Sequence, residues 1–119
     1  MLHAFRLHTG PDNASHVTEG VVTQNELTGV ISIQFKESPL HSALDWHEAP
    51  ECQYVITLSG TLEFTTRDGE RFVLHPGDVL VAEDCIGSGH KWCLIDNQPR
   101  RRAYVVLKPG TPSGFVAKE

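Results

Sequence analysis

Apolar and polar residues alternate with a period of two through most of this chain. The runs 29–35 (GVISIQF) and 53–58 (QYVITL) are rich in β-branched and aromatic side chains, which is typical of strands. No window keeps apolar residues at positions i, i+3 and i+4 for the roughly ten residues that a helix would need. The ten glycines and seven prolines lie mostly between the apolar runs. Short strands separated by turn residues predict an all-β barrel or sandwich.

The turns between the predicted strands are marked by Asp, Gly and Pro. Asp68-Gly69 predicts a tight hairpin, and Pro76-Gly77 predicts another turn. The basic run 100–102 (RRR) follows a proline and is interpreted as a solvated loop. The predicted strands are residues 18–23, 29–35, 40–47, 53–58, 61–66, 71–74, 79–82, 90–95 and 103–107, with weaker candidates at 3–7 and 115–116.

Length and charge limit the domain count and the partners. The chain has 119 residues, which suits a single domain over residues 1–119. A net charge of −5 argues against nucleic acid or an anionic membrane as a partner. No apolar stretch approaches the ~20 residues of a membrane span, and the first ten residues lack the order of a signal peptide. The three cysteines have no zinc-like spacing, so we expect a cytoplasmic protein with reduced thiols.

The stretch 45–60 places polar residues inside apolar sequence. Alternation puts Asp45 and His47 on one face of a strand and Leu44 on the other. Gln53 opens the next strand, which is otherwise apolar. Burying a polar group without a partner costs about 1–3 kcal/mol. These three polar residues therefore predict either a functional site or an internal hydrogen-bonded network.

The spacing of this stretch resembles the first motif of the cupin family, H-x-H-x3-E-x6-G. With Gly60 aligned to the glycine of the motif, His47 takes the first histidine position. Gln53 takes the glutamate position, and Ala49 stands where the second histidine would be. Of the three metal ligands that the family places in this motif, one is kept, one becomes an amide and one is lost.

A second cupin motif, G-x5-P-x-G-x2-H-x3-N, resembles residues 75–84 (HPGDVLVAED) and the segment that follows them. Gly77 matches its glycine, and His90, two residues later than the pattern expects, is the best match for its histidine. The resemblance covers roughly residues 40–107. It implies a single-domain jelly-roll β-barrel.

The resemblance also implies that the histidine and glutamate positions point into the barrel. The expected pocket consists of Asp45, His47, Gln53 and His90, lined by Val55, Thr57 and Trp92. In this interpretation His47, Gln53 and His90 are metal ligands, and Asp45 and His90 are catalytic. Imidazole, carboxylate and amide oxygen ligands suit divalent Fe, Mn, Ni or Zn. Without a metal, His47 or His90 beside Asp45 could serve as a general acid–base pair.

Three functions fit these residues. The first is a metal-dependent enzyme of the oxygenase, isomerase or lyase type that acts on a small polar organic substrate. The second is a metal-free cupin that binds, and could isomerise, a small polar ligand through the same side chains. The third is a sensory or scaffold module whose barrel is only a packed core.

The remaining polar residues near the expected pocket receive weaker interpretations. Glu83 and Asp84 open the loop that leads to His90. They could contact a ligand, but we interpret them as solvated loop acids. Cys85 lies in the same loop and is the candidate for a reactive thiol.

The outer face of the central strand also needs a cover. Tyr54, Ile56 and Leu58 fall on the face opposite the pocket residues. We predict a symmetric homodimer that buries apolar strand faces and edges. The alternative is that the N-terminal segment covers this face within one subunit.

Overall fold

The computed structural model describes residues 1–118, which form strands and turns but no helix. The predicted all-β class is therefore confirmed. Within these residues no helix is long and apolar enough to cross a membrane. The strands are β1 (Leu2–Thr9), β2 (Ser15–Val22), β3 (Val30–Ser38), β4 (Ala43–His47), β5 (Gln53–Ser59), β6 (Leu62–Thr66), β7 (Arg71–Leu74), β8 (Val79–Glu83), β9 (His90–Leu94), β10 (Arg100–Leu107) and β11 (Phe115–Ala117).

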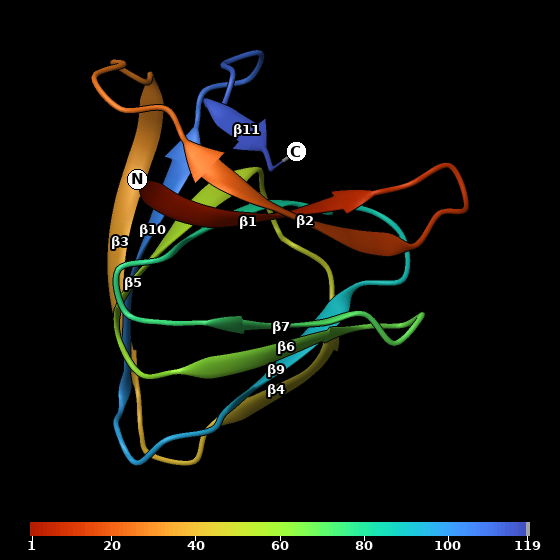
Figure 1. Cartoon of the computed structure of the whole chain (residues 1–119), viewed down its shortest axis with the longest axis vertical. Coiled ribbons are helices and arrows are strands. Elements are labelled where there is room, and N and C mark those ends of the chain that lie inside the picture. Colours follow the sequence, from red (N-terminus) through yellow and green to blue (C-terminus); the bar gives the residue numbers. More distant parts are fainter. Residues whose placement is uncertain (119) are drawn as a thin grey trace.

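Two sheets build the barrel. The larger sheet has the order β11-β2-β1-β8-β5-β10-β3, and the smaller sheet has the order β4-β9-β6-β7. Figure 1 shows the smaller sheet below β1 and β2, with β3, β10 and β5 along one side. β1 and β8 pair in parallel, whereas the neighbouring pairs β1–β2 and β5–β8 are antiparallel. This arrangement is the expected jelly-roll barrel.

The interior is filled by alternate residues from the two sheets. In β9 the residues His90, Trp92 and Leu94 are buried while Lys91 and Cys93 are exposed. This is the period-two pattern of a strand with one face in a core. The buried apolar residues of the main core are Phe5, Leu7, Ala49, Val55, Leu62, Phe64, Phe72, Leu74, Leu80, Ala82, Trp92 and Leu94.

The basic run at residues 100–102 belongs to strand β10, so the solvated-loop prediction was wrong. The side chains of Arg100 and Arg102 are buried, at 2% exposure each. Arg101 points the other way, and its Nε donates to Glu37 of β3 at 2.5 Å. Arg102 Nη1 donates to Ser38 Oγ at 2.8 Å. All three residues of the run are charged, but the alternation of a strand directs two of the three side chains inward.

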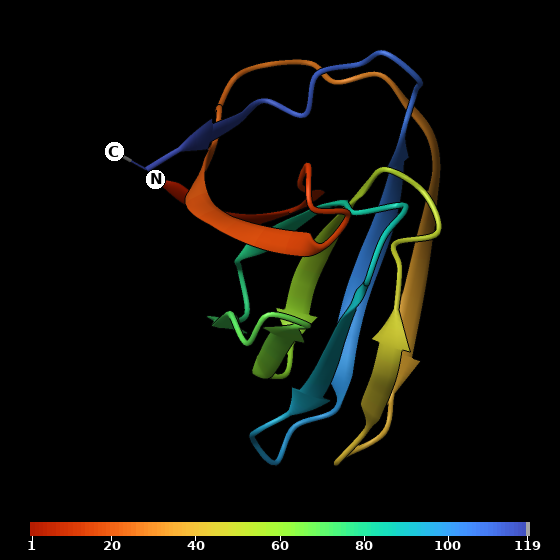
Figure 2. The ribbon, with the colours of Figure 1, turned by 90° about the vertical axis from the view of Figure 1, so that its right-hand side faces the viewer.

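The outer face of β5 is partly covered by the chain's own ends. Tyr54 is buried beside Val81 and Val105, and Val22 of β2 and Phe115 of β11 pack against this group. Figure 2 shows β2 and β11 on the same side of the barrel, near both termini. The alternative of a cover within one subunit is therefore seen at Tyr54, where the C-terminal strand contributes as well as the N-terminal segment.

Strand β3 is different, because it is exposed on its apolar side. It lies at one edge of the larger sheet and pairs with β10. Ile31, Ile33 and Phe35 are 61%, 58% and 71% exposed. An unpaired edge with apolar side chains is a surface on which another strand can pair.

Candidate functional site

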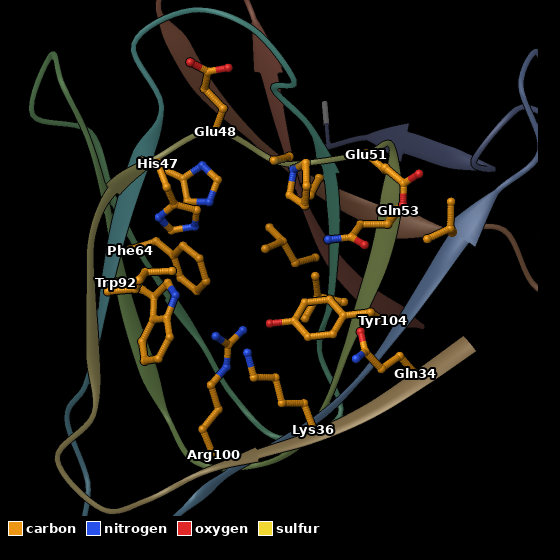
Figure 3. Close-up of a pocket in the computed structure, with 18 of the residues that line it drawn as sticks. Gln34, Lys36, His47, Glu48, Glu51, Gln53, Phe64, Trp92, Arg100 and Tyr104 are labelled. Carbon is orange, nitrogen blue, oxygen red and sulfur yellow. The ribbon is translucent and has the colours of Figure 1, made fainter. Parts of the chain in front are cut away.

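A cavity of about 490 Å³ lies between the two sheets. One wall comes from β3, β5, β8 and β10, another from β6 and β9, and the remaining lining residues come from β4 and the loop that follows it. Figure 3 shows polar side chains from several strands directed into this space. The residues that line it are Ser32, Gln34, Lys36, Leu44, His47, Glu48, Ala49, Pro50, Glu51, Gln53, Val55, Phe64, Leu80, Ala82, His90, Trp92, Arg100, Tyr104 and Val106.

His47 and His90 lie side by side at one end of the cavity. They are paired residues on the neighbouring strands β4 and β9. Their ring centroids are 4.4 Å apart, and the ring planes meet at 63°. His90 is buried, with 4% of its surface exposed, whereas His47 is half-buried. The structure thus brings together two imidazoles that are 43 positions apart in the sequence (90 − 47).

Asp45 lies outside the cavity, which corrects its predicted place beside His47. The β4–β9 pairing shifts register between Leu44 and His47, so Asp45 and Trp46 face the single residue Lys91. Such a bulge breaks the period-two alternation. It places Leu44 and His47 on the cavity while the exposed Asp45 carboxylate accepts a hydrogen bond from the Trp46 N–H at 2.8 Å.

Gly89 makes the close approach at His47 possible. It has a φ of +75°, and a Cβ added there would lie 2.4 Å from the His47 carbonyl oxygen. A side chain at this position would force the backbone beneath His47 to move.

The Gly89→Ala variant is therefore expected to lose roughly 2–3 kcal/mol of stability. The matched control is Gly69→Ala, because Gly69 has a φ of +90° but its added Cβ would meet nothing within 4 Å. That control should lose only about 1 kcal/mol, from backbone strain alone. Urea unfolding of both variants measures the difference. Equal losses would show that the contact with His47 is unimportant.

Asp84 is the carboxylate that contacts the histidine pair. Its side chain is fully buried, and its Oδ2 accepts from His90 Nδ1 at 2.5 Å and from Ser15 Oγ at 2.7 Å. Its other oxygen, Oδ1, has no partner among residues 1–118. The interpretation of Asp84 as a solvated loop acid was wrong. Its neighbour Glu83 is not in a loop either: it ends strand β8, and its carboxylate pairs with Arg6 Nε at 2.8 Å. A second acid directly after strand β8, six residues before His90, is the sequence signal that points to it.

The hydrogen bonds of the two rings fix their tautomers. His47 Nδ1 lies 2.8 Å from the Asp45 carbonyl oxygen, which can only accept, so Nδ1 carries the proton. His90 Nδ1 donates to Asp84 in the same way. Both Nε2 atoms are left with a lone pair when the rings are neutral. Burial and, to a smaller degree, the neighbouring His90 lower the pKa of His47 below its ordinary value.

The other predicted pocket residues are divided by the structure. Gln53, Val55 and Trp92 line the cavity with the two histidines. Figure 3 shows the Gln53 amide directed into the open space. Thr57 is buried but does not line the cavity, because it lies beyond Val55 toward the turn at Asp78.

A family comparison agrees with this arrangement of strands. A family model that describes the cupin domain matches residues 34–93, which is half of the chain. The chain belongs to the cupin family. A search of curated proteins finds no match to it.

The cavity of this cupin also contains cationic groups that the sequence analysis missed. Arg100 lines it, with its guanidinium 4.4 Å above the centre of the Trp92 ring. Its Nε has no hydrogen-bond partner in the described part of the chain, and burial lowers the pKa of Arg100 to about 10. Lys36 lines the same end. Figure 3 shows both side chains directed into the cavity from the end opposite His47.

A second polar cluster lies outside the cavity. His16, Asp68 and Glu70 offer ligand atoms within 4.8 Å of one another, as a metal site would require. However, His16 Nδ1 lies 2.7 Å from Glu70 Oε1, and its Nε2 lies 2.8 Å from Asp12 Oδ2. An imidazolium that donates to carboxylates from both nitrogens accounts for this geometry.

The pKa of His16 is accordingly expected above 6.5, because its hydrogen bonds to Glu70 and Asp12 favour the charged ring. The resulting stabilisation is fully present below the pKa of the unfolded state and is lost as the pH rises through the folded-state pKa. NMR titration measures the pKa, and Glu70→Gln should lower it. His8 is the internal control, since burial lowers its pKa. A His16 pKa at or below that of His8 would contradict the ion-pair interpretation.

The Cys85 thiol shows no sign of activation as a nucleophile. Burial, followed by the adjacent Cys52 thiol, raises the pKa of Cys85 to about 11. A thiol with a raised pKa forms little thiolate at neutral pH. The interpretation of Cys85 as a reactive thiol is therefore not supported by its surroundings.

Proposed function

We propose that this cupin catalyses proton transfer on a small polar organic compound bound in the cavity, as an isomerase or lyase does. The observation that supports this most is the buried Asp84–His90 pair, with Nδ1 and Oδ2 2.5 Å apart, in contact with the ring of His47. A carboxylate behind an imidazole holds the ring in one tautomer and orientation. Such an imidazole can take a proton from a ligand at Nε2 and return it.

Asp84 also acts electrostatically in this proposal. When His90 accepts a proton, the ring becomes positively charged in a buried place. The negative charge of Asp84 stabilises that imidazolium, because Coulomb interactions are strong in a medium of low dielectric constant. Ser15 donates to the same carboxylate oxygen and holds it in position.

His47 is the second proton carrier. Its lowered pKa keeps the ring neutral at neutral pH, so its Nε2 can accept a proton. Gln53 contributes an amide that can donate a hydrogen bond to a carbonyl oxygen of the ligand. Two bases and one donor around one cavity suit removal of a proton next to a carbonyl group and its return at a neighbouring atom.

The proposal predicts exchange of such protons with solvent. Small ketones, aldehydes and oxo acids are incubated with the protein in D2O, and loss of the C–H signal is followed by proton NMR. The wild-type protein should accelerate exchange for at least one of them, and His90→Gln should slow it by about 10²–10⁴-fold. His75→Gln is the control, since His75 is an exposed turn residue. Failure of the whole panel, or equal rates in His90→Gln, would contradict proton-transfer catalysis.

A metal-dependent cupin is the second candidate, and the two free Nε2 atoms favour it. His47, His90 and the carbonyl oxygen of Gln53 would hold a divalent Fe, Mn, Ni or Zn ion. Such an ion would supply a Lewis acid that polarises a substrate oxygen. We rank this second because neither Glu48 nor Glu51 points toward the pair, and because two cations share the cavity.

Elemental analysis of protein made without a metal-binding tag separates the two candidates. Stoichiometric metal that is lost in His47→Gln and His90→Gln would favour the second candidate. A metal content far below one ion per chain, unchanged after Fe, Mn, Ni and Zn are added, would favour metal-free proton transfer.

We also propose that the protein is a cytoplasmic homodimer in which a second copy covers the exposed face of β3. Its outward apolar residues and its unpaired edge support this. Light scattering should give the mass of two chains, and Phe35→Asp should reduce it to one. A wild-type protein with the mass of a single chain would contradict the dimer.

A further inference from the structure

The end of the cavity opposite the histidines contains a buried cation without a counterion. Arg100 is 2% exposed, and its Nε has no hydrogen-bond partner within residues 1–118. No carboxylate among these residues forms an ion pair with it. The guanidinium is instead placed against aromatic faces, 4.4 Å from the Trp92 ring centre and 6.0 Å from that of Phe64. Burying an unpaired charge is costly, and proteins usually pair such a charge.

Two further groups converge on the same end. Lys36 of β3 lines the cavity, and Figure 3 shows its ammonium directed toward the space beside Arg100. Tyr104 also points into this space, and its hydroxyl oxygen accepts a hydrogen bond from Arg102 Nε at 3.1 Å. The tyrosine proton therefore remains free to be donated to a ligand.

The acidic residues of the site lie elsewhere. Glu48 and Glu51 lie in the exposed loop after β4, and Figure 3 shows their carboxylates directed away from the cavity. Asp84 is behind His90, at the histidine end. The positive charge at the Arg100 end is thus not neutralised by the described residues.

We propose that Arg100 and Lys36 bind the carboxylate of a small organic acid whose other end reaches His47 and His90. This deepens the proposed function and rests on the cavity being its ligand site. A guanidinium presents parallel N–H donors that match the two oxygens of a carboxylate. Val55, Leu80 and Val106 also line the cavity, so we expect the body of the ligand between its two polar ends to be apolar.

Paired probes test the requirement for the charge. Benzoate and hexanoate are compared with benzamide and hexanamide, which have similar shapes and no charge, and with inorganic phosphate. Binding is measured by calorimetry and by the shift of the thermal unfolding midpoint. We expect at least one carboxylate to bind and stabilise the protein, its amide to bind at least tenfold more weakly, and carboxylate affinity to fall as salt is added.

Variants assign the charge to its residues. Arg100→Met should weaken carboxylate binding at least tenfold, and Arg100→Lys should weaken it less. Arg101→Met is the matched control, because Arg101 is the next residue and lies outside, paired with Glu37. Lys36→Met, on the exposed edge strand, provides a second test that keeps the core intact. Lys36→Met should weaken the binding of carboxylates more than the binding of amides.

Each of four results would overturn the inference. The first is that the amides bind as well as the carboxylates, and the second is that Arg100→Met leaves the carboxylate affinity unchanged. The third is that neither carboxylate binds at millimolar concentration, and the fourth is that phosphate binds while the carboxylates do not.

Failure of this inference can be separated from failure of the proposed function. His47→Gln and His90→Gln should retain carboxylate binding, since the carboxylate lies at the other end. Carboxylates that bind through Arg100 but never exchange protons would leave the anion site standing and refute proton transfer. If uncharged ketones exchange protons at equal rates in Arg100→Met and in the wild-type protein, proton transfer would stand and the carboxylate site would lose its support.

Discussion

The Asp84→Asn variant is expected to exchange ligand protons about 10²–10⁴-fold more slowly than the wild-type protein. The asparagine has the same shape and can still accept the His90 Nδ1–H through its carbonyl oxygen. It carries no charge, so the imidazolium that forms on His90 loses its counterion. The slope of exchange rate against pH should change as well, because the proton acceptor is altered. Exchange in D2O followed by NMR gives both quantities.

Ligand affinity separates this role from a structural one. Asp84 lies behind His90 and does not line the cavity. The affinity for carboxylates should therefore change less than twofold in Asp84→Asn, while the rate of proton exchange falls by the factor given above. Ser15→Ala is the companion variant, since it removes one donor to the same oxygen and leaves the charge. Ser15→Ala should lower the free energy of unfolding by about 1 kcal/mol. It should slow proton exchange much less than Asp84→Asn does. A variant Asp84→Asn that exchanges protons normally would show that Asp84 only fills space.

The sequence predicted the strands and much of the cavity wall, because both depend on local alternation. Gln53 and Val55 share a face of β5, and His90 and Trp92 share a face of β9, as the period of two requires. The family motif supplied the positions of His47 and His90, which no local rule could have paired. The roles of these residues as ligands or catalysts stay predictions.

The predictions failed where one extra residue shifted the inward and outward alternation of a strand, or where a charged side chain was buried by contacts with other strands. A bulge between Leu44 and His47 moved Asp45 out of the cavity, and nothing in the local pattern marks a bulge. Arg100 and Asp84 were interpreted as solvated because charged residues are mostly exposed. Their burial depends on contacts with residues of other strands, which the local pattern does not show. Asp84 is held by Ser15 and His90, and Arg100 lies on Trp92. In this chain, the burial of charged residues is therefore the property that the sequence alone predicts least well.

The Phe64→Ala variant is expected to lose about 3–5 kcal/mol of stability. Phe64 is 1% exposed, and its ring is stacked on that of Phe72 at 4.9 Å with nearly parallel planes. It also lies 5.9 Å from the His90 ring and faces the cavity. Removal of the ring leaves a hole beside the cavity that the rigid strands cannot close. Thermal unfolding should begin roughly 10–20 °C lower.

A second phenylalanine provides the control and a further result. Phe35 is 71% exposed on β3, so Phe35→Ala should change the stability of a single subunit by less than about 0.5 kcal/mol. In a dimer formed through β3 the same substitution would cost more, and the cost would depend on protein concentration. Unfolding at several concentrations therefore distinguishes core packing from subunit packing. A large loss in Phe35→Ala that did not vary with concentration would mean that β3 is covered within its own subunit, contrary to its exposed position. A loss under 1 kcal/mol in Phe64→Ala would mean that the barrel closes around the missing ring.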